Sequence, residues 1–156
     1  MLYFDNVPEI IEKLKTVYCK NDICPPHVVL AKVDGDYEKE IMNIFAKRRN
    51  FKLLFDKVML RDGIIAVCPS NICKIEDLIG TLKFQEYILD VPDKFYMTIG
   101  NKTGKDMEST IIDKAIIPKL KMPFEIQVEG LGIIKMDKSV RKKHRKWVES
   151  GKITLN

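Results

Sequence analysis

The sequence predicts an α+β fold in which helices flank mixed, largely antiparallel sheets. Apolar residues recur at the helical period in some segments and as short β-branched or alternating runs in others, and the two kinds of segment alternate along the chain. The short turn 61–63 joins two strands and requires antiparallel pairing. With 156 residues and 46% hydrophobic content, the chain suits one packed domain. We expect that domain over 1–136, followed by a basic helix or tail over 137–156.

The first elements are an amphipathic helix, a buried strand and a second helix. Apolar positions over 7–18 follow the 3.6-residue period, and Pro8 suits a first helical turn. The β-branched run 27–33 is typical of a buried strand. A turn at 34–36 then leads into a second helix, where Arg48 and Arg49 complement the C-terminal dipole.

A hairpin follows, and its first strand changes phase. Apolar residues occupy odd positions up to Phe55 and then Val58 and Leu60, which indicates a β-bulge in the strand 51–60. The return strand is 64–68. The remaining expected elements are a helix capped by Ser70 or Asn71 and ending near Leu82, a strand over 95–100, a helix over 107–117, and a strand over 124–136 bent at Gly130 and Gly132.

Positive charge is concentrated near the end of the chain. The net charge is +5. Between Lys135 and Lys152 there are eight Lys or Arg against two acids, whereas the rest of the chain holds 19 basic and 20 acidic residues. A basic end on a nearly neutral body favours attraction to a polyanion, and a solvated helix face is the alternative interpretation.

The four cysteines are expected to be reduced thiols. Met1–Asp5 does not have the pattern of a signal peptide, and no apolar run is long enough to span a membrane, so we expect a cytosolic or nuclear protein without a membrane partner. Zinc ligation by two Cys-x4-Cys pairs with His27 is the alternative, although Cys-x2-Cys is the commoner spacing. We therefore expect neither a metal nor a cofactor.

Two strands begin in a similar way. One reads Pro25-Pro26-His27-Val28-Val29-Leu30, the other Lys94-Phe95-Tyr96-Met97-Thr98-Ile99-Gly100, and each leads through a polar turn into a helix. Residues two apart on a strand face the same way. This layout resembles the two-histidine (2H) phosphoesterase superfamily, with its LigT-like RNA phosphoesterases and cyclic phosphodiesterases, over roughly 25–136. Members carry a His-h-Thr/Ser-h motif, where h is apolar, on each of two paired strands.

The resemblance implies a two-lobed fold and a phosphate cleft, with one imidazole as base, the other as acid, and hydroxyls on the phosphate oxygens. Here the first motif keeps His27 but has Val29 in the hydroxyl position. The second keeps Thr98 but has Tyr96 in the imidazole position. The candidate catalytic residues are therefore His27, Tyr96 and Thr98. A phenol can donate to a phosphate but is a poor base at neutral pH, so we expect impaired catalysis. Structural roles for the same residues are the alternative.

Two basic segments could supply further phosphate contacts. Gly100–Asp106 lies between a strand and a helix, as a P-loop does, but its glycine spacing and Asp106 do not fit. Lys102 and Lys105 remain candidates at the cleft mouth. The tail offers a cluster of cations and one stacking ring, namely Arg141, Lys142, Lys143, Arg145, Lys146 and Trp147. Nuclear localisation is an equally simple interpretation of this cluster.

The sequence thus predicts a diverged 2H phosphoesterase-like protein that binds or hydrolyses RNA 2′,3′-cyclic phosphate ends or 2′,5′-linked or cyclic nucleotides. Its partner is expected to be RNA or a nucleotide. The alternative is a non-enzymatic RNA-binding or protein-interaction module that acts through the basic tail. An α+β fold unrelated to the 2H family is a third possibility.

Overall fold

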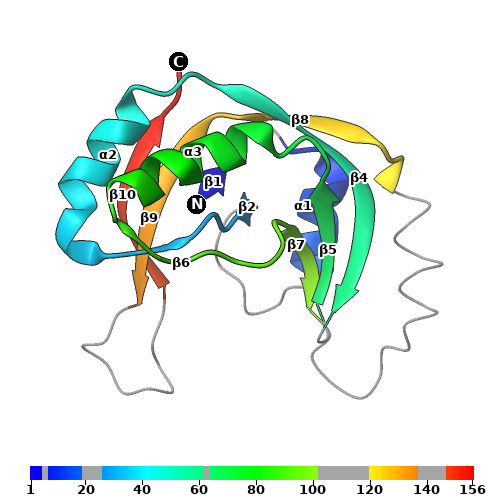
Figure 1. Ribbon diagram of the computed structural model, residues 1–156. Coiled ribbons are helices and arrows are strands. Elements are labelled where there is room, and N and C mark those ends of the chain that lie inside the picture. Colours follow the sequence, from blue (N-terminus) through cyan, green and yellow to red (C-terminus); the bar gives the residue numbers. More distant parts are fainter. Residues whose placement is uncertain (5–6, 19–25, 62–63, 102–119, 137–146) are drawn as a thin grey trace.

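The computed structural model describes residues 1–4, 7–18, 26–61, 64–101, 120–136 and 147–156 (Figure 1). Within these residues there is no helix that is both long and apolar enough to cross a membrane. The helices are α1 (Glu9–Tyr18), the short 3-10 turn η1 (Gly35–Tyr37), α2 (Glu38–Ala46) and α3 (Cys73–Phe84). The strands are β1 (Leu2–Tyr3), β2 (His27–Val28), β3 (Lys32–Val33), β4 (Phe51–Arg61), β5 (Ile64–Pro69), β6 (Ile88–Asp90), β7 (Met97–Asn101), β8 (Phe124–Val128), β9 (Gly130–Met136) and β10 (Trp147–Thr154).

Eight strands form one sheet in the order β10-β9-β1-β2-β7-β5-β4-β8, and β3 pairs with β6 in a small second ribbon. All the described strand pairs are antiparallel. This confirms the predicted α+β class with a largely antiparallel sheet. The two strands with similar starts, β2 and β7, are neighbours at the middle of the large sheet.

The chain reaches each of these central strands in a similar way. A strand and a helix precede β2, in the order β1–α1–β2, and β1 then pairs with β2. Likewise β5 and α3 precede β7, and β5 pairs with β7. The likeness between the two strand starts therefore extends to the units that contain them.

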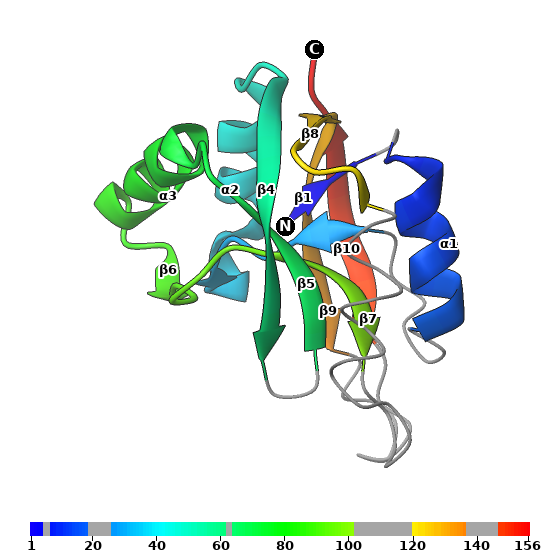
Figure 2. The ribbon, with the colours of Figure 1, turned by 90° about the vertical axis from the view of Figure 1, so that its right-hand side faces the viewer.

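The helices form because each has one apolar face to bury. Ile41 and Phe45 of α2 are buried, and α2 packs against β9 and β10. In α3 the buried residues recur at helical spacing, at Ile75, Leu78, Ile79 and Leu82. Helix α1 lies against β7, away from α2 and α3 (Figure 2). Buried residues of all three helices and of strands across the large sheet, from β9 to β8, belong to one core cluster.

The predicted bulge in β4 is confirmed. Phe55 pairs with Pro69 and Lys57 pairs with Cys68, so Asp56 is an extra residue between the two pairs. Before the bulge, Leu53 and Phe55 are fully buried, and Phe55 stacks on Phe124 of β8. The bulge therefore reverses which residues of β4 face the core.

Two long strands expected from the sequence are divided in the structure. The segment 27–33 forms β2 and β3, because the chain leaves the large sheet after Val28 and pairs with β6. The segment 124–136 forms β8 on β4 and β9 on β1 and β10. Between them the backbone of Glu129 donates to Tyr3 and accepts from Leu155. Tertiary pairing partners, which a single strand pattern does not contain, decide both interruptions.

The expected helix or tail over 137–156 is wrong over Trp147–Thr154, which is strand β10 on β9. The basic residues suggested a solvated helix or tail. In the structure the pairing of β10 with β9 continues past a register shift between Glu149 and Gly151. Leu155, which follows β10, is buried in the core. The remainder of that segment, 137–146, and the expected helix 107–117 lie outside the described residues.

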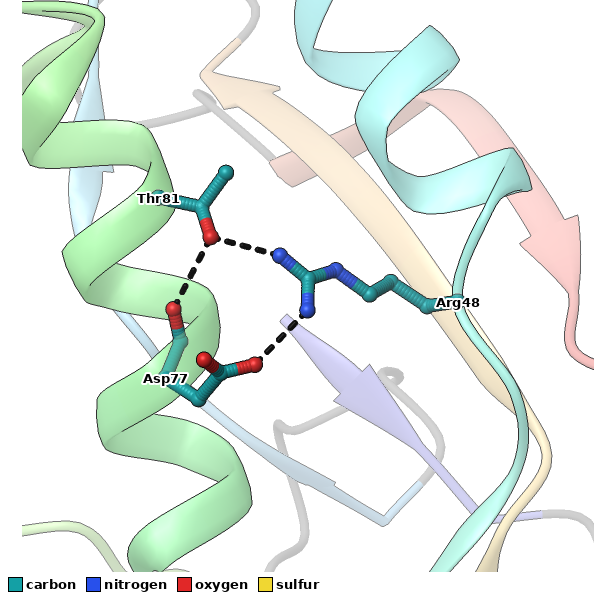
Figure 3. Close-up of polar contacts among 3 residues, drawn as sticks. All are labelled: Arg48, Asp77 and Thr81. Atoms are coloured by element: carbon teal, nitrogen blue, oxygen red, sulfur yellow. Dashed lines mark hydrogen bonds and ion pairs between the residues drawn. The ribbon is translucent and has the colours of Figure 1, made fainter.

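Polar contacts, rather than the expected cap, attach α3 to the sheet and to α2. Ile72 precedes α3 without a side-chain cap, while Asn71 accepts from the backbone N–H of Leu54 and donates to the carbonyl of Lys52. Arg48, just after α2, donates to the Asp77 carboxylate at 2.7 Å and to the Thr81 hydroxyl at 2.6 Å (Figure 3). Arg48 therefore links the two helices instead of only complementing a dipole.

Candidate functional site

The pairing of β2 with β7 brings the two sequence motifs together. Val28 pairs with Met97. Continuing this antiparallel register by one residue within the strands puts His27 across from Thr98, while Val29 directly follows β2 and Tyr96 directly precedes β7. Residues directly opposite each other on paired strands project to the same face of a sheet. His27 and Thr98 therefore share one face, and Val29 and Tyr96, each two residues along the chain from one of them, continue it by strand alternation. We call this the motif face.

The four motif residues are less buried than the neighbouring residues that project to the opposite face. Val28, Met97 and Leu2, which project the other way, are fully buried. On the motif face His27, Tyr96 and Thr98 are half-buried, and Val29 is 45% exposed. Side chains that are partly open to solvent yet held by a buried strand core are suited to binding a ligand in a fixed geometry.

Tyr3 extends the motif face beyond His27. It pairs with His27 on one side and with Gly130 on the other. A Cβ atom on Gly132 would lie 2.4 Å from Cε2 of Tyr3, so the Tyr3 ring lies over a position where only glycine fits. The Lys152 Nζ atom lies 4.8 Å from the centroid of that ring, within range of a cation–π interaction. The two-residue strand that carries Tyr3 is too short for a periodic signal, which is why sequence reasoning missed it.

Cys68 lies on β5, which flanks β7 on the side of the motif strands opposite to β1 and Tyr3. Val67 pairs with Met97, so the next residue, Cys68, is across from Tyr96. Burial raises the pKa of the Cys68 thiol, while Lys94 and Lys57 act in the opposite direction. The thiol is therefore protonated at neutral pH and is a poor nucleophile. The signal that could have found Cys68 is its alternation with Ala66 and Ile64 in the hairpin.

The four motif positions supply one imidazole, one aliphatic hydroxyl and one phenol. His27 supplies a group that can accept or donate a proton near neutral pH. Thr98 supplies a donor for a phosphate oxygen, and Tyr96 a second, more acidic donor. A second imidazole is absent from the described part of this face, since the other histidine of the chain, His144, lies outside the described residues.

The other predicted contact residues are not located relative to the motifs. Lys102, Lys105, Arg141, Lys142, Lys143, Arg145 and Lys146 lie outside the described residues. Trp147 is the first residue of β10, and only its backbone is described. Cys19 and Cys24 are also outside, whereas Cys68 and Cys73 are free thiols. Among the described side chains, no group of three or more His, Cys, Asp or Glu could hold a metal ion.

A surface hollow between the start of α2 and β10 is separate from the motif residues. Its lining includes Asp36, Glu38, Glu40 and Met42. Glu38 accepts a hydrogen bond from Lys135, which holds the pKa of Glu38 below its ordinary value. Ionised carboxylates repel phosphate, so this hollow is a poor candidate for a nucleotide site.

Comparison of the sequence with protein-family models and with curated proteins gives no match. The structure, in contrast, resembles solved structures over nearly its whole length. Escherichia coli LigT complexed with 3′-AMP has a TM-score of 0.57 and 12% identity, covering 99% of this chain and 96% of that one. A structure described as a phosphoesterase gives the same values. LigT complexed with NADP+ has a TM-score of 0.53 and 10% identity, covering 99% and 95%.

At such low identity the likeness establishes the fold, and it agrees with the family that the paired motifs predicted. The chain therefore has the fold of the LigT-like 2H phosphoesterases.

Proposed function

We propose that this protein is a diverged 2H phosphoesterase-like protein that binds the phosphate of an RNA 2′,3′-cyclic end, or of a 2′,5′-linked or cyclic nucleotide, on the motif face. Its hydrolytic activity is weak or absent. The single observation that carries the proposal is the pairing of Val28 with Met97, since this register gives the residues of both motifs a common face. The fold likeness to LigT supports it.

In this proposal His27 and Thr98 act on the same phosphate. The Thr98 hydroxyl donates to a non-bridging oxygen, and protonated His27 donates to the bridging or leaving oxygen. Tyr96 provides a third donor. With one imidazole, the protein cannot pair a general base on water with a general acid on the leaving group. Losing one such group typically lowers the rate by about 10²–10⁴, so binding is retained while turnover is lost.

Binding is tested with 3′-AMP, which is held by LigT in one of the similar structures, and with 2′,3′-cyclic AMP. We expect His27→Ala and Thr98→Val each to weaken binding, measured by calorimetry, by about tenfold, as loss of a charge-assisted or direct hydrogen bond predicts. Thr154→Val removes an exposed hydroxyl from the edge strand β10 and is the matched control. Equal affinity for the wild type, His27→Ala and Thr98→Val contradicts a phosphate site at these residues.

A gain-of-function variant tests the geometry directly. Val29→Thr with Tyr96→His restores the hydroxyl and the imidazole that the two motifs lack. We expect the double variant to hydrolyse 2′,3′-cyclic nucleotides at least about 10²-fold faster than the wild type, and to lose that gain when His27→Ala is added. A double variant that folds and binds 3′-AMP yet gains no rate would show that the four positions do not surround one phosphate.

The second candidate function, RNA binding through the basic residues near the C-terminus, is favoured by a separate observation. The excess positive charge of the chain lies between Lys135 and Lys152. Replacing Arg141, Lys142, Lys143, Arg145 and Lys146 with glutamine removes that charge and leaves β10 intact. If this function is correct, RNA affinity and its salt dependence fall together, while binding of 3′-AMP is unchanged.

A further inference from the structure

The corner between α3 and β6 exposes apolar side chains that the proposed function does not use. Phe84, the last residue of α3, is 85% exposed, and Leu89 of β6 is 60% exposed. Tyr37 of η1 is 42% exposed, and its ring stacks on that of Tyr87 with 4.6 Å between the ring centroids. We call Tyr37, Phe84, Tyr87 and Leu89 the apolar corner. Exposed apolar residues are ordinary when scattered, but a cluster of them indicates an interaction site.

Backbone pairing fixes the apolar corner in place. β6 pairs with β3 in the small ribbon, and the N–H of Asp34 donates to the carbonyl of Tyr87 at 3.0 Å. Because η1 begins directly after Asp34, this bond brings Tyr37 to Tyr87. Tyr87 and Ile88 also pack against the core, whereas Leu89 is mostly exposed. The apolar corner is therefore a preformed surface supported by the core.

A hydrogen-bonded turn joins Phe84 to the rest of the apolar corner. The N–H of Glu86 donates to Lys83 at 2.9 Å, and that of Tyr87 donates to Leu82 at 3.1 Å, which is the bonding pattern of a Schellman motif. Glu86 has a φ of 60° and occupies the position of this motif that favours glycine. Backbone strain of this kind is found at functional positions, so the Glu86 carboxylate is a candidate contact.

The charge around the apolar corner is opposite in sign to that of the rest of the chain. Residues 32–37 and 83–90 together hold four acidic residues and two lysines, whereas the remainder of the chain holds 18 acidic and 25 basic residues. Glu86 and Asp90 are both exposed. A net acidic surface repels the phosphates of nucleic acids and of anionic lipids, and it attracts cationic side chains. The charge therefore favours a basic protein segment as the ligand of this surface.

We propose that the apolar corner is a docking site for a partner protein that presents a basic amphipathic segment. Apolar side chains of that segment cover Phe84 and Leu89, and its Lys or Arg side chains pair with Glu86 and Asp90. Large apolar anchors supply most of the affinity in such contacts, while charge pairs steer and orient the partner. Since β3 and β6 are outside the eight-stranded sheet that carries the motifs, this function adds to the phosphate site and does not depend on it.

The probe is a labelled synthetic peptide with leucine at helical spacing and lysine elsewhere, and fluorescence anisotropy measures its binding. We expect this lysine peptide to bind, and the same peptide with glutamate in place of lysine to bind at least about tenfold more weakly. Phe84→Ser and Leu89→Ser should each weaken binding of the lysine peptide by about tenfold. Leu60→Ser, which replaces a leucine of β4 that is 46% exposed, is the matched control and should have no effect.

Glu86 allows a test in which binding and stability change in opposite directions. Glu86→Gly removes the carboxylate and relieves the positive φ, so binding should weaken by about threefold while the melting temperature rises by roughly 2–4 °C. Glu86→Gln removes only the charge, so binding should weaken without that rise. Glu76→Gln, at an exposed position of α3, removes the same charge and should leave both quantities unchanged.

Three results would overturn the proposal. The first is failure of the lysine peptide to bind, or binding that Phe84→Ser and Leu89→Ser leave unchanged. The second is equal binding of the glutamate peptide. The third is binding of vesicles that contain anionic lipid in preference to the lysine peptide, lost in the same variants, which would identify a membrane site instead. Thermal unfolding and unchanged binding of 3′-AMP verify that each variant is folded.

Discussion

His27 and Thr98 lie far apart in the sequence and become neighbours through one pair of short strands. Their residue types were recognisable from the sequence, because the spacing of two along a strand is a local property. Their neighbours on the motif face were not, because Tyr3 and Cys68 are brought there by the pairing of β1 with β2 and of β5 with β7. The chemistry of the motif face is therefore only partly encoded in its two motifs.

At the scale of single residues, Cys68 provides a reporter of ligand binding. Burial raises its pKa, so we expect iodoacetamide at pH 8 to modify Cys68 more slowly than the exposed Cys73, and a bound nucleotide to slow Cys68 further without protecting Cys73. Peptide mass spectrometry measures both rates. Equal rates with and without the nucleotide would contradict a ligand beside Tyr96.

The raised pKa of Cys68 also determines how the free energy of unfolding changes with pH. A thiol whose pKa is raised in the folded protein ionises first in the unfolded chain. Below the ordinary thiol pKa, near 8.5, both states are neutral and Cys68 has no effect. As the pH rises above that value, the unfolded state gains thiolate, and the free energy of unfolding decreases. Cys68→Ser should flatten this alkaline limb in urea unfolding experiments.

At the scale of secondary structure, the sequence predicted α1, α2, α3 and the hairpin well and the strand ends poorly. The β4 bulge was visible because burial enforces the alternation of apolar residues, so an extra residue changes their phase. The division of 27–33 and of 124–136 was not visible, because both segments stay apolar while they exchange pairing partners. Asn71 was likewise assigned to a helix cap although it bonds to β4.

Replacing either of two glycines with alanine tests the packing of these elements, and the two variants should change the free energy of unfolding in opposite directions. A Cβ on Gly132 would lie 2.4 Å from the Tyr3 ring and 2.9 Å from the carbonyl oxygen of Gly151, so Gly132→Ala should destabilise the protein by about 1–3 kcal/mol. A Cβ on Gly80 of α3 meets nothing within 4 Å, so Gly80→Ala should stabilise it by about 0.5–1 kcal/mol. Urea unfolding measures both. Unchanged stability of Gly132→Ala would contradict the position of Tyr3.

At the scale of the whole molecule, the residues that follow β10 are hydrogen-bonded to two segments that are far apart in the sequence. The backbone N–H of Asn50 donates to Asn156, and that of Leu155 donates to Glu129. Leu155 is buried and Ile153 packs against the core. The last residues are therefore part of the domain, even though their composition suggested a solvated tail.

Removing 147–156 should consequently abolish cooperative unfolding. The deletion exposes the pairing edge of β9 and removes buried apolar surface at Leu155, and an unpaired strand edge promotes aggregation. Circular dichroism and calorimetry of the truncated chain provide the measurement. A truncated chain with the wild-type melting temperature would show that β10 contributes nothing to the fold.

The sequence by itself determined the α+β class, the helices α1, α2 and α3, the β4 bulge and the two motifs whose pattern predicted a 2H-like fold. Each of these depends on local periodicity, which backbone geometry ties to residue spacing. Only the tertiary structure decided that β2 and β7 are neighbours and that residues 147–154 are a strand. Those features depend on which strands pair, and pairing is chosen by burial of the whole core rather than by any single segment.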